Sequence, residues 1–497
     1  MATTSTTSEQ TTPLAHPDRF YIDGKWVDPS TTSMIDVVQP HTELVGYRVA
    51  EAQEADIDRA ITAARRAFDE GPWPRMSPSE RTGFLRGIAA GLRDRGLDLA
   101  EMWTNEVGVV NSFAVAGSAN AGGAYDSYAD LGDEFSFIER HPPGVPGEVA
   151  FLVREPVGVV GAIIPWNSGS GASAFKIAPA LLAGCTVVAK APPEAPSSLL
   201  ILAEVADSIG LPPGVLNVLT AEREVSELLV HDARVDKISF TGSTAVGRRI
   251  ASICGQRMAR FTLELGGKSA GVVLDDYELE LVASALGTSA TRMTGQTCAS
   301  LTRIIVSRDR HDDLVEALAE RFSQVRVGDP YDPETQMGPL AMARQRDRVE
   351  HYIAKGIEEG ATLATGGARP AHLDRGFYIE PTIFGNVDNN FTIAREEIFG
   401  PVLSVIPARD EEHAIALAND TEFGLNNAVF THDADRAFAI ALQLRSGNVG
   451  QNAARYNFNV GFGGLKQSGV GREGGRDGLL PYLEAKTVLL DAEPTTL

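Results

Sequence analysis

Short apolar runs and amphipathic segments alternate along the chain between residues 157 and 265. The apolar runs are rich in β-branched residues and predict strands at 157–165, 185–192, 214–220, 235–240 and 261–265. The segments between them repeat apolar positions with helical periodicity, at 173–184, 197–210, 224–230 and 246–253. Strands that alternate with helices in this way are typical of right-handed βαβ units. The pattern therefore predicts a parallel, doubly wound, Rossmann-like domain.

A second alternation of the same kind begins near residue 269. Its predicted strands are 269–274, 302–307, 402–408, 426–431 and 447–452, and its predicted helices are 278–291, 310–322 and 342–359. Two earlier helices, at 56–70 and 78–95, are expected to pack on the first domain. The strand-like segments 137–156 and 479–491 belong to neither series. Because exposed strands of this sort invite pairing with another chain, we expect them to form a small β arm between subunits.

The composition is that of a globular protein, with 43% hydrophobic and 22% charged residues in a chain of 497. The formal net charge of -22 repels phosphate backbones and anionic lipids, so neither nucleic acid nor a membrane is an expected partner. The longest apolar stretch, 157–165, is too short to cross a bilayer. The first 18 residues lack the basic and apolar regions of a signal peptide, and we expect a disordered tail there.

Three cysteines, with no close pair, indicate a reducing compartment, and we expect the protein in the cytoplasm. Cys185 and Cys254 lie in apolar runs and are expected to pack in the core; Gly255 is expected to end the helix that carries Cys254. Cys298 differs, because its neighbours in the run GQTCAS are small or polar. A lone cysteine is most often a buried small hydrophobe. The neighbours of Cys298 instead favour an accessible nucleophile with free backbone N–H groups beside it.

Three further segments carry candidate chemistry. Gly242, Ser243 and Gly247 follow a predicted strand and begin a helix, which suits either a bound phosphate or a simple tight turn. Lys190 and Glu194 follow the run CTVVA at 185–189, at the carboxyl end of that strand, where they are either ribose ligands or a solvated charge pair.

Glu264 lies between leucines, and burial would raise its pKa toward that of a general base. Asn167, after Trp166 at another strand end, is placed to donate to an oxyanion.

Six motifs in this order resemble those of the aldehyde dehydrogenase superfamily: PWN at 165–167, FTGS at 240–243, LELGGKS at 263–269, GQTC at 295–298, EEIFGPV at 396–402 and FGGLKQSGVGREGG at 462–475. The resemblance covers residues 20–490. It implies that Cys298 attacks an aldehyde and that Asn167 and the Cys298 backbone N–H form the oxyanion hole. It also implies that Glu264 activates water to hydrolyse the thioester, and that Lys176 lies near the oxyanion site.

The resemblance implies NAD as cofactor, rather than NADP, and no metal. Glu397 would hold the nicotinamide ribose beside Phe399, and Lys190 with Glu194 would hold the adenosine ribose, although the interval between them is four residues where many relatives have three. The other implied cofactor-binding residues are Ile164, Pro165, Trp166, Gly242, Ser243, Gly247, Leu265 and Gly266.

The substrate is predicted to be a hydrophobic aldehyde lined by Trp166, Phe175, Tyr456 and Phe462. A carboxylate-bearing semialdehyde is the alternative, because Arg292 resembles an arginine that holds a substrate carboxylate in such relatives. A second alternative is transfer of the acyl group to coenzyme A, which the presence of Glu264 disfavours. A catalytically silent structural protein is a third.

The predicted fold is thus α/β, with a Rossmann-like dinucleotide-binding domain, a second α/β catalytic domain and a small β oligomerisation arm that makes a homodimer or homotetramer. The corresponding boundaries are 1–125 with 151–262, then 263–455, and 126–150 with 478–497, with 1–18 as the disordered tail.

Overall fold

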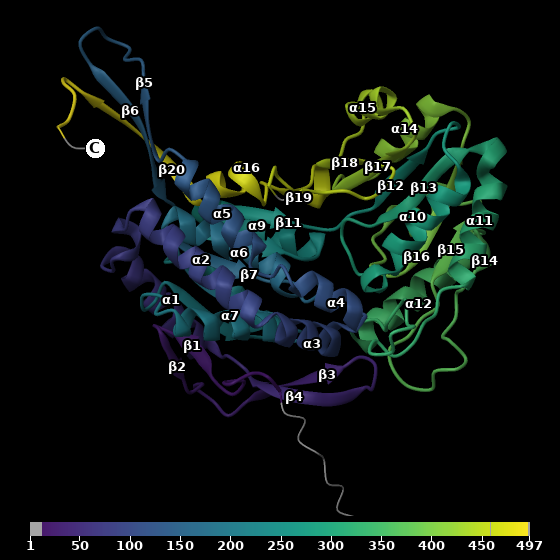
Figure 1. The fold of residues 1–497 in the computed structure, drawn as a ribbon, viewed down its shortest axis with the longest axis horizontal. Helices are drawn as coiled ribbons and strands as arrows, with labels where there is room; N and C mark the ends of the chain where they lie inside the picture. The colour runs from purple at the N-terminus through teal and green to yellow at the C-terminus, as the bar shows by residue number, and fades with distance from the viewer. Residues whose placement is uncertain (1–11, 458, 496–497) are drawn as a thin grey trace, which may run out of the picture.

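The computed structural model describes residues 12–457 and 459–495, and Figure 1 shows two α/β units with a β arm. The first sheet has the order β19-β11-β10-β7-β8-β9-β1-β2. Its central strands, β11 to β9, are parallel, as the alternation predicted, and the outer strands are antiparallel. The strands are β1 (Phe20–Ile22), β2 (Lys25–Val27), β7 (Val159–Ile163), β8 (Thr186–Ala191), β9 (Leu216–Thr220), β10 (Lys237–Thr241), β11 (Arg260–Glu264) and β19 (Gly469–Val470).

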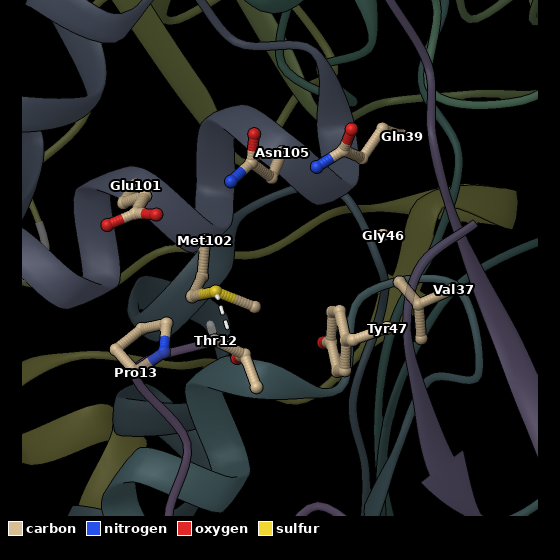
Figure 2. A pocket seen from close by; sticks show the side chains of 9 residues that line it. All are labelled: Thr12, Pro13, Val37, Gln39, Gly46, Tyr47, Glu101, Met102 and Asn105. Carbon is tan, nitrogen blue, oxygen red and sulfur yellow. Dashed lines mark hydrogen bonds between the residues drawn. The ribbon is translucent and has the colours of Figure 1, made fainter. Parts of the chain in front are cut away.

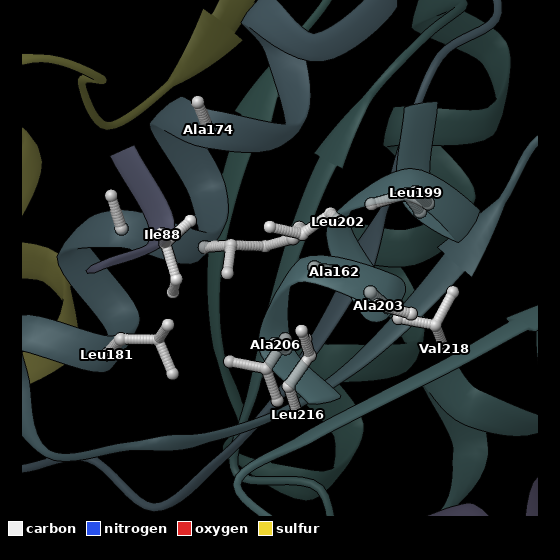
Figure 3. Close-up of a cluster of buried hydrophobic side chains, with 14 of the residues drawn as sticks. Ile88, Ala162, Ala174, Leu181, Leu199, Leu202, Ala203, Ala206, Leu216 and Val218 are labelled. Carbon is white, nitrogen blue, oxygen red and sulfur yellow. The ribbon is translucent and has the colours of Figure 1, made fainter. Parts of the chain in front are cut away.

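Helices cover both faces of this sheet, because successive strand residues point to opposite sides. On β8, Val187 and Ala189 join the core under one helical layer, while Val188 joins the core under the other. Leu181, Leu202 and Leu216 belong to the first of these cores (Figure 3). The first layer has α2 (Pro78–Asp94), α3 (Gly96–Val107), α5 (Gly123–Glu134), α6 (Gly169–Ala183) and α7 (Ser197–Ser208); the second has α1 (Glu54–Asp69), α8 (Arg223–His231) and α9 (Thr244–Arg257).

The second sheet has the order β14-β15-β16-β13-β12-β17-β18 and is parallel except at β14. Its strands are β12 (Ser269–Val273), β13 (Leu301–Ser307), β14 (Thr362–Thr365), β15 (Thr382–Gly385), β16 (Val402–Ala408), β17 (Asn426–Phe430) and β18 (Asn448–Gln451). One face packs on α10 (Leu279–Thr291) and α11 (His311–Ser323), and the other on α12 (Ala343–Glu358), α13 (Thr392–Arg395), α14 (Glu411–Asn419) and α15 (Ala434–Ala441). The sequence therefore predicted both sheets and most of their helices.

Smaller elements connect these units. The hairpin of β3 (Met34–Gln39) and β4 (Leu44–Ala50), which the sequence pattern did not reveal, contacts the helical layer through α3. The remaining elements are α4 (Asn111–Ser118), α16 (Gly475–Leu479), and the 3-10 turns η1 (Trp73–Arg75), η2 (Arg292–Gly295), η3 (Arg308–Arg310), η4 (Lys466–Ser468) and η5 (Leu480–Tyr482). None of the helices in the described residues has both the length and the apolar character needed to cross a bilayer.

The arm is a three-stranded antiparallel sheet that extends away from the two units (Figure 1). Its strands are β5 (Ile138–His141), β6 (Val149–Pro156) and β20 (Leu483–Leu490). Its bounds differ from the expected 126–150 and 478–497, because α5 occupies 126–134 and Tyr482 is buried in the first core. The whole of β6 also lies in the arm, whereas residues from 151 onward were assigned to the dinucleotide-binding domain. Burial of the flanking aromatic side chains therefore sets where the arm begins.

The sequence predicted a disordered tail at residues 1–18. This prediction is wrong for residues 12–18, and residues 1–11 lie outside the described part of the chain. Leu14 is buried in the first core. The backbone N–H of Ala15 donates to Glu204 at 2.7 Å. Thr12 contacts Met102 and lines a small cavity with it (Figure 2). These contacts fix residues 12–18 on the first unit. The polar composition of the segment did not indicate such contacts.

Candidate active site

The first sheet changes direction between β7 and β10, which are neighbours in the sheet although β8 and β9 come between them in the chain. The chain leaves β7 toward α6 on one face and leaves β10 toward α9 on the other. In open α/β sheets, ligands bind outside the carboxyl ends of the strands at such a point. Two predicted cofactor-binding segments lie there: Ile164, Pro165 and Trp166 follow β7, and Gly242 and Ser243 follow β10.

The segment after β10 forms a regular helix N-terminus. Ser243 is the N-cap of α9, and its hydroxyl accepts a hydrogen bond from the Val246 backbone N–H at 3.4 Å. The free N–H groups and the helix dipole make this end suitable for an anion. Gly247 faces the protein interior, where a Cβ would overlap the side chain of Leu265. The structure therefore gives Gly247 a packing role against Leu265, which the sequence pattern did not indicate.

Lys190 lies at the carboxyl end of β8 and is buried. Burial lowers its pKa to about 8, while the charges of Glu194 and Glu222 act in the opposite direction. Glu194 forms an ion pair with Arg344 of α12. The sequence placed Lys190 and Glu194 together at a ribose. The structure adds a cationic side chain from the second unit at Glu194.

Cys298 lies just after the turn η2 and is half-buried beside Ala299, Leu425 and Phe462. The pKa of its thiol is raised to about 12, first by burial and then by the charges of Glu397 and Glu264. The thiol is therefore protonated near neutral pH and needs a base to become a nucleophile. Both other cysteines are fully buried, as expected for packing residues.

Asn167 connects the end of β7 to the loop that carries Cys298. The Asn167 side-chain Nδ2 donates to the carbonyl oxygen of Gln296 at 2.9 Å, and the Asn167 carbonyl oxygen accepts a hydrogen bond from Trp103 Nε1 at 3.0 Å. Gln296 is itself held by the Met293 carbonyl and the Ala341 N–H, each at 3.0 Å. An amide carries two hydrogens, so the second Nδ2 hydrogen of Asn167 is left to act as an oxyanion donor.

Glu264 ends β11, and its carboxyl group is buried with neither oxygen hydrogen-bonded to a described residue. A Cβ at Gly463 would lie 2.7 Å from Oε1, so the carboxyl group rests against that glycine. Burial raises the pKa of Glu264 well above its ordinary value, and the charge of Glu473 raises it further, whereas Lys176 and Arg472 lower it. An unpartnered buried carboxyl group is costly, and it is the arrangement expected of a general base that receives a water molecule.

Lys176 is fully buried in α6 and forms an ion pair with Glu473. The sequence placed Lys176 near the oxyanion site but did not single out Glu473, although it lies within the motif at 462–475. Because both residues influence the pKa of Glu264, the pair belongs to the electrostatic environment of that carboxyl group.

The turn after Leu265 joins the two halves of the site. The Gly267 backbone N–H donates to Glu397 Oε1 at 3.0 Å, and a Cβ at Gly266 would crowd the same carboxylate. A Cβ at Gly267 would overlap the carbonyl oxygen of Cys298. The two glycines thus let one turn contact both the predicted ribose ligand Glu397 and the backbone of the nucleophile.

Aromatic residues surround this turn. Phe399, at a positive φ of 61°, meets the ring of Trp166 edge-on with centroids 5.5 Å apart. Tyr456 meets Phe462 in the same way at 5.7 Å, and Phe462 packs with Cys298. Phe175 packs against the core of the first unit. The predicted residues Phe462 and Tyr456 are therefore brought to the thiol.

Arg292 begins η2, and its guanidinium lies 5.0 Å from the ring centroid of Phe113. Its charge lowers the pKa of Tyr456, against burial and the charge of Cys298, which raise it. The exposed Arg292 therefore lies close enough to Tyr456 for its charge to act on that hydroxyl. In the described part of the chain, no cluster of three or more His, Cys, Asp and Glu side chains is arranged to hold a metal ion.

Sequence reasoning missed Glu473, Gln296, Gly267 and Arg344. The first three lie inside motifs that the sequence analysis used, but only the fold shows which atoms they contact. Arg344 carried no signal, since its partner Glu194 is 150 residues away in the chain.

Comparison with known proteins agrees with this geometry. Residues 26–488 match the model of the aldehyde dehydrogenase family. The chain is 41% identical to the geranial dehydrogenase of Castellaniella defragrans, covering 95% of this chain and 98% of that protein. It is 40% identical to a 3-succinoylsemialdehyde-pyridine dehydrogenase of a Pseudomonas species, with the same coverage of the two chains.

Solved structures show the same fold. The Mycobacterium tuberculosis aldehyde dehydrogenase complexed with NAD⁺ superimposes with a TM-score of 0.92 and 42% identity, covering 97% of this chain and 99% of that one. A cysteine-to-alanine mutant of aldehyde dehydrogenase C from Pseudomonas syringae, in complex with NAD⁺ and octanal, gives a TM-score of 0.93 and 36% identity, covering 98% of this chain and 100% of that one.

Proposed function

The chain belongs to the aldehyde dehydrogenase family, and we propose that it oxidises a hydrophobic aldehyde to its carboxylic acid through a thioester at Cys298. It is an NAD-dependent aldehyde dehydrogenase. The observation that carries the finer proposal is the arrangement around the thiol. The Asn167 amide is fixed to the loop of Cys298, the Glu264 carboxyl group is buried without a protein partner, and Phe462 forms an apolar wall.

The carboxyl ends of β7 and β10 fit NAD. The N-terminus of α9 suits the pyrophosphate, while Lys190 with Glu194 and Glu397 suit the two riboses. Gly266 keeps space that a Cβ would fill beside Glu397. A carboxylate at the adenosine ribose repels a 2'-phosphate, which supports NAD over NADP. When bound, NAD accepts the hydride that the oxidation releases.

In the first step, Cys298 Sγ forms a bond to the aldehyde carbon and its proton passes to Glu264. The raised pKa of Glu264 makes its carboxylate a stronger base, and its charge already influences the Cys298 pKa. The developing oxyanion accepts hydrogen bonds from Asn167 Nδ2 and the Cys298 backbone N–H. One such donor is typically worth ~3 kcal/mol in the transition state.

The thiohemiacetal carbon then loses its hydride and becomes a thioester, and Glu264 gives the thiol proton to solvent. In the last step, the Glu264 carboxylate takes a proton from a water molecule, whose oxygen attacks the thioester carbon. The carbon–sulfur bond breaks, the Cys298 thiolate regains a proton and the carboxylic acid leaves. The charges of Lys176 and Arg472 favour the carboxylate form of Glu264 that this step requires, while Glu473 opposes it.

Apolar and aromatic groups near the thiol support a hydrophobic substrate. Tyr456 and Phe462 lie edge to face beside Cys298, and Trp166 lies at the end of β7. One relative is named a geranial dehydrogenase, and one neighbour structure is a complex with octanal; both aldehydes are hydrophobic. A panel of aliphatic, aromatic, terpenoid and carboxylated aldehydes compared by kcat/KM tests this; a preference for carboxylated aldehydes would overturn the substrate class.

Two alternatives have their own tests. Arg292, close to Tyr456, favours a carboxylate-bearing semialdehyde as the second candidate, and Arg292→Gln would then raise KM for carboxylated aldehydes alone. For transfer to coenzyme A, the product would be an acyl-CoA. We expect free acid instead, since Glu264 is available to activate water.

The arm and the cysteines support two further proposals. We propose a homodimer or homotetramer that joins through the arm, where Ile138, Val145 and Leu489 expose apolar side chains. We propose the cytoplasm as the compartment, because all three cysteines are free. The oligomer proposal rests on the exposed strands of the arm, and the compartment proposal rests on the unpaired cysteines.

A further inference from the structure

A second cavity, of about 280 Å³, lies against the turn η2, whose last residue is three positions before Cys298. It is formed by the start of α4, the end of α10, the end of α11 and residues 335–338. Among the described residues, neither Cys298 nor the aromatic residues of the proposed substrate site line it; Arg292 alone borders both. We propose that this cavity binds a small organic carboxylate and that the bound anion restrains the loop of Cys298.

The charge of the cavity favours an anion. Arg292 and Arg321 both line it, no carboxylate does, and neither arginine has an ion-pair partner in the described residues. The chain has 66 acidic and 44 basic residues, so a cavity lined by two arginines and no carboxylate differs in charge from the molecule as a whole. Gly287 provides the room for Arg321, since a Cβ there would lie 2.8 Å from the Arg321 Cγ. Guanidinium groups are well suited to bind carboxylates in two-point hydrogen bonds.

A second and independent observation comes from Thr335. Its side chain is 5% exposed, lines the cavity, and its Oγ1 has no hydrogen-bond partner within the described chain. A buried hydroxyl without a partner costs free energy, and Oγ1 now lies against Gly328, so a turn about the Cα–Cβ bond of Thr335 would be needed to bring it to a ligand oxygen. Val110 and Phe113 provide apolar lining on the α4 side. Ligand pockets usually span ~300–1,000 Å³, so a carboxylate with a short apolar body is the class that fits.

The turn that forms one wall is also the start of the catalytic loop. Met293, Thr294 and Gly295 have φ values of 51°, 55° and 71°. Thr294 Oγ1 donates to the carbonyl oxygens of Gly338 and Pro339, at 3.0 and 3.1 Å, which ties the turn to the opposite wall. The next residue, Gln296, accepts the hydrogen bond of Asn167. A ligand that bridges Arg292 and Arg321 would therefore restrain the loop that carries Cys298. The effect of this restraint on the reaction rests on the proposed role of Cys298 as the nucleophile.

Binding is tested on the full-length protein without any aldehyde, so the result does not depend on turnover. The probes are butyrate, inorganic phosphate and the neutral butyramide, titrated by calorimetry and by thermal shift. We expect saturable binding of butyrate, weaker binding of phosphate because it lacks an apolar body, and none of butyramide. Arg321→Gln should weaken butyrate by about tenfold or more, as expected for a lost hydrogen bond between charged groups. The control Arg326→Gln changes an arginine outside the cavity that pairs with Asp332, and should bind butyrate normally.

Coupling is tested by the rate at which a maleimide reagent alkylates Cys298, which is half-buried. Butyrate should slow this alkylation in the wild type and the Arg326→Gln variant, but not in Arg321→Gln. Unchanged binding in Arg321→Gln would overturn the assignment of the cavity, since any butyrate bound would then lie in the catalytic pocket. Absence of butyrate binding to the wild type would also overturn the assignment of the cavity. Aldehyde oxidation is measured separately, and its result tests the proposed function alone. Tighter binding of phosphate than butyrate would exclude the carboxylate class.

Discussion

At the scale of single residues, burial disfavours the charged forms of both proposed reactive groups. It raises the pKa of Cys298 to about 12 and raises that of Glu264 well above its ordinary value. The thiol therefore keeps its proton, and the carboxyl group tends to hold one. The same burial makes each group more reactive once deprotonated, because a desolvated thiolate and carboxylate are stronger nucleophile and base. Activity is accordingly expected to rise with pH through the titration of Glu264.

Replacement of Cys298 by alanine should abolish NADH formation, because no other group in the site can form the thioester. Rates are measured by absorbance at saturating aldehyde and NAD. Cys254→Ala is the matched control: Cys254 is fully buried in the first unit, so its loss should lower stability by ~1 kcal/mol or more and leave turnover intact. Turnover by the Cys298→Ala variant would refute the covalent mechanism.

Replacement of Glu264 by glutamine should slow both steps, and hydrolysis of the thioester more than its formation, because water is a weaker acid than the Cys298 thiol and depends more on the base. We expect a burst of NADH in stopped-flow traces followed by turnover reduced by ~10²–10⁴, the usual range for a general base. In the wild type, the hydrolysis rate should increase with pH, since the carboxylate form becomes populated only as pH rises through the raised pKa. This dependence should disappear in the variant; a pH profile identical to that of the wild type would assign the base elsewhere.

At the scale of elements, the turn between β11 and β12 shows how two units share one site. Its glycines bring Glu397 and the carbonyl of Cys298 against the same backbone. The sequence showed the glycines but not what approaches them. Gly255 shows the converse, because the sequence predicted that it would end a helix. The structure contradicts this: α9 continues to Arg257 and ends at Met258, in a left-handed conformation with φ of 57°.

Gly267→Ala should reduce kcat/KM by at least tenfold, since the added Cβ overlaps the Cys298 carbonyl and must displace the loop. Gly255→Ala is the control within a helix: nothing lies within 4 Å of its Cβ, and the change should stabilise α9 by ~0.5–1 kcal/mol without loss of activity. Steady-state kinetics and thermal unfolding measure both effects. Full activity in Gly267→Ala would contradict this expectation, because it would show that the loop of Cys298 can move away from the added Cβ without loss of function.

At the scale of the whole molecule, contacts between distant segments place the arm and join the units. The ion pair between Glu194 and Arg344 connects the two α/β units next to Lys190. In the arm, β20 pairs with β6 more than 300 residues earlier in the chain, with Leu490 opposite Val149. The free edges of this sheet are β5 and β20. Exposed edges with apolar side chains are the surface that another copy of the chain would cover.

The double substitution Ile138→Asp with Leu489→Asp should shift the protein toward monomer, because both side chains are exposed in the arm, at 44% and 60%. Light scattering after size exclusion reports the mass. The control Leu97→Asp changes a leucine that is 73% exposed outside the arm and should leave the mass unchanged. An unaltered mass in the double variant would remove the arm from the subunit interface.

The sequence by itself determined the two α/β units and singled out Cys298, Glu264 and Asn167 as candidate reactive residues. It could do so because strand and helix periodicity are local, and because small or polar residues around a lone thiol, or a carboxylate among leucines, are visible in a short window. Only the tertiary structure decided the partners: Glu473 for Lys176, Arg344 for Glu194, and Gly463 against Glu264. The tertiary structure also decided that residues 12–18 are ordered against the first unit, and where the arm begins. These depend on contacts between segments more than a hundred residues apart, and on burial, which raises a pKa or fixes a polar segment only after the chain has folded.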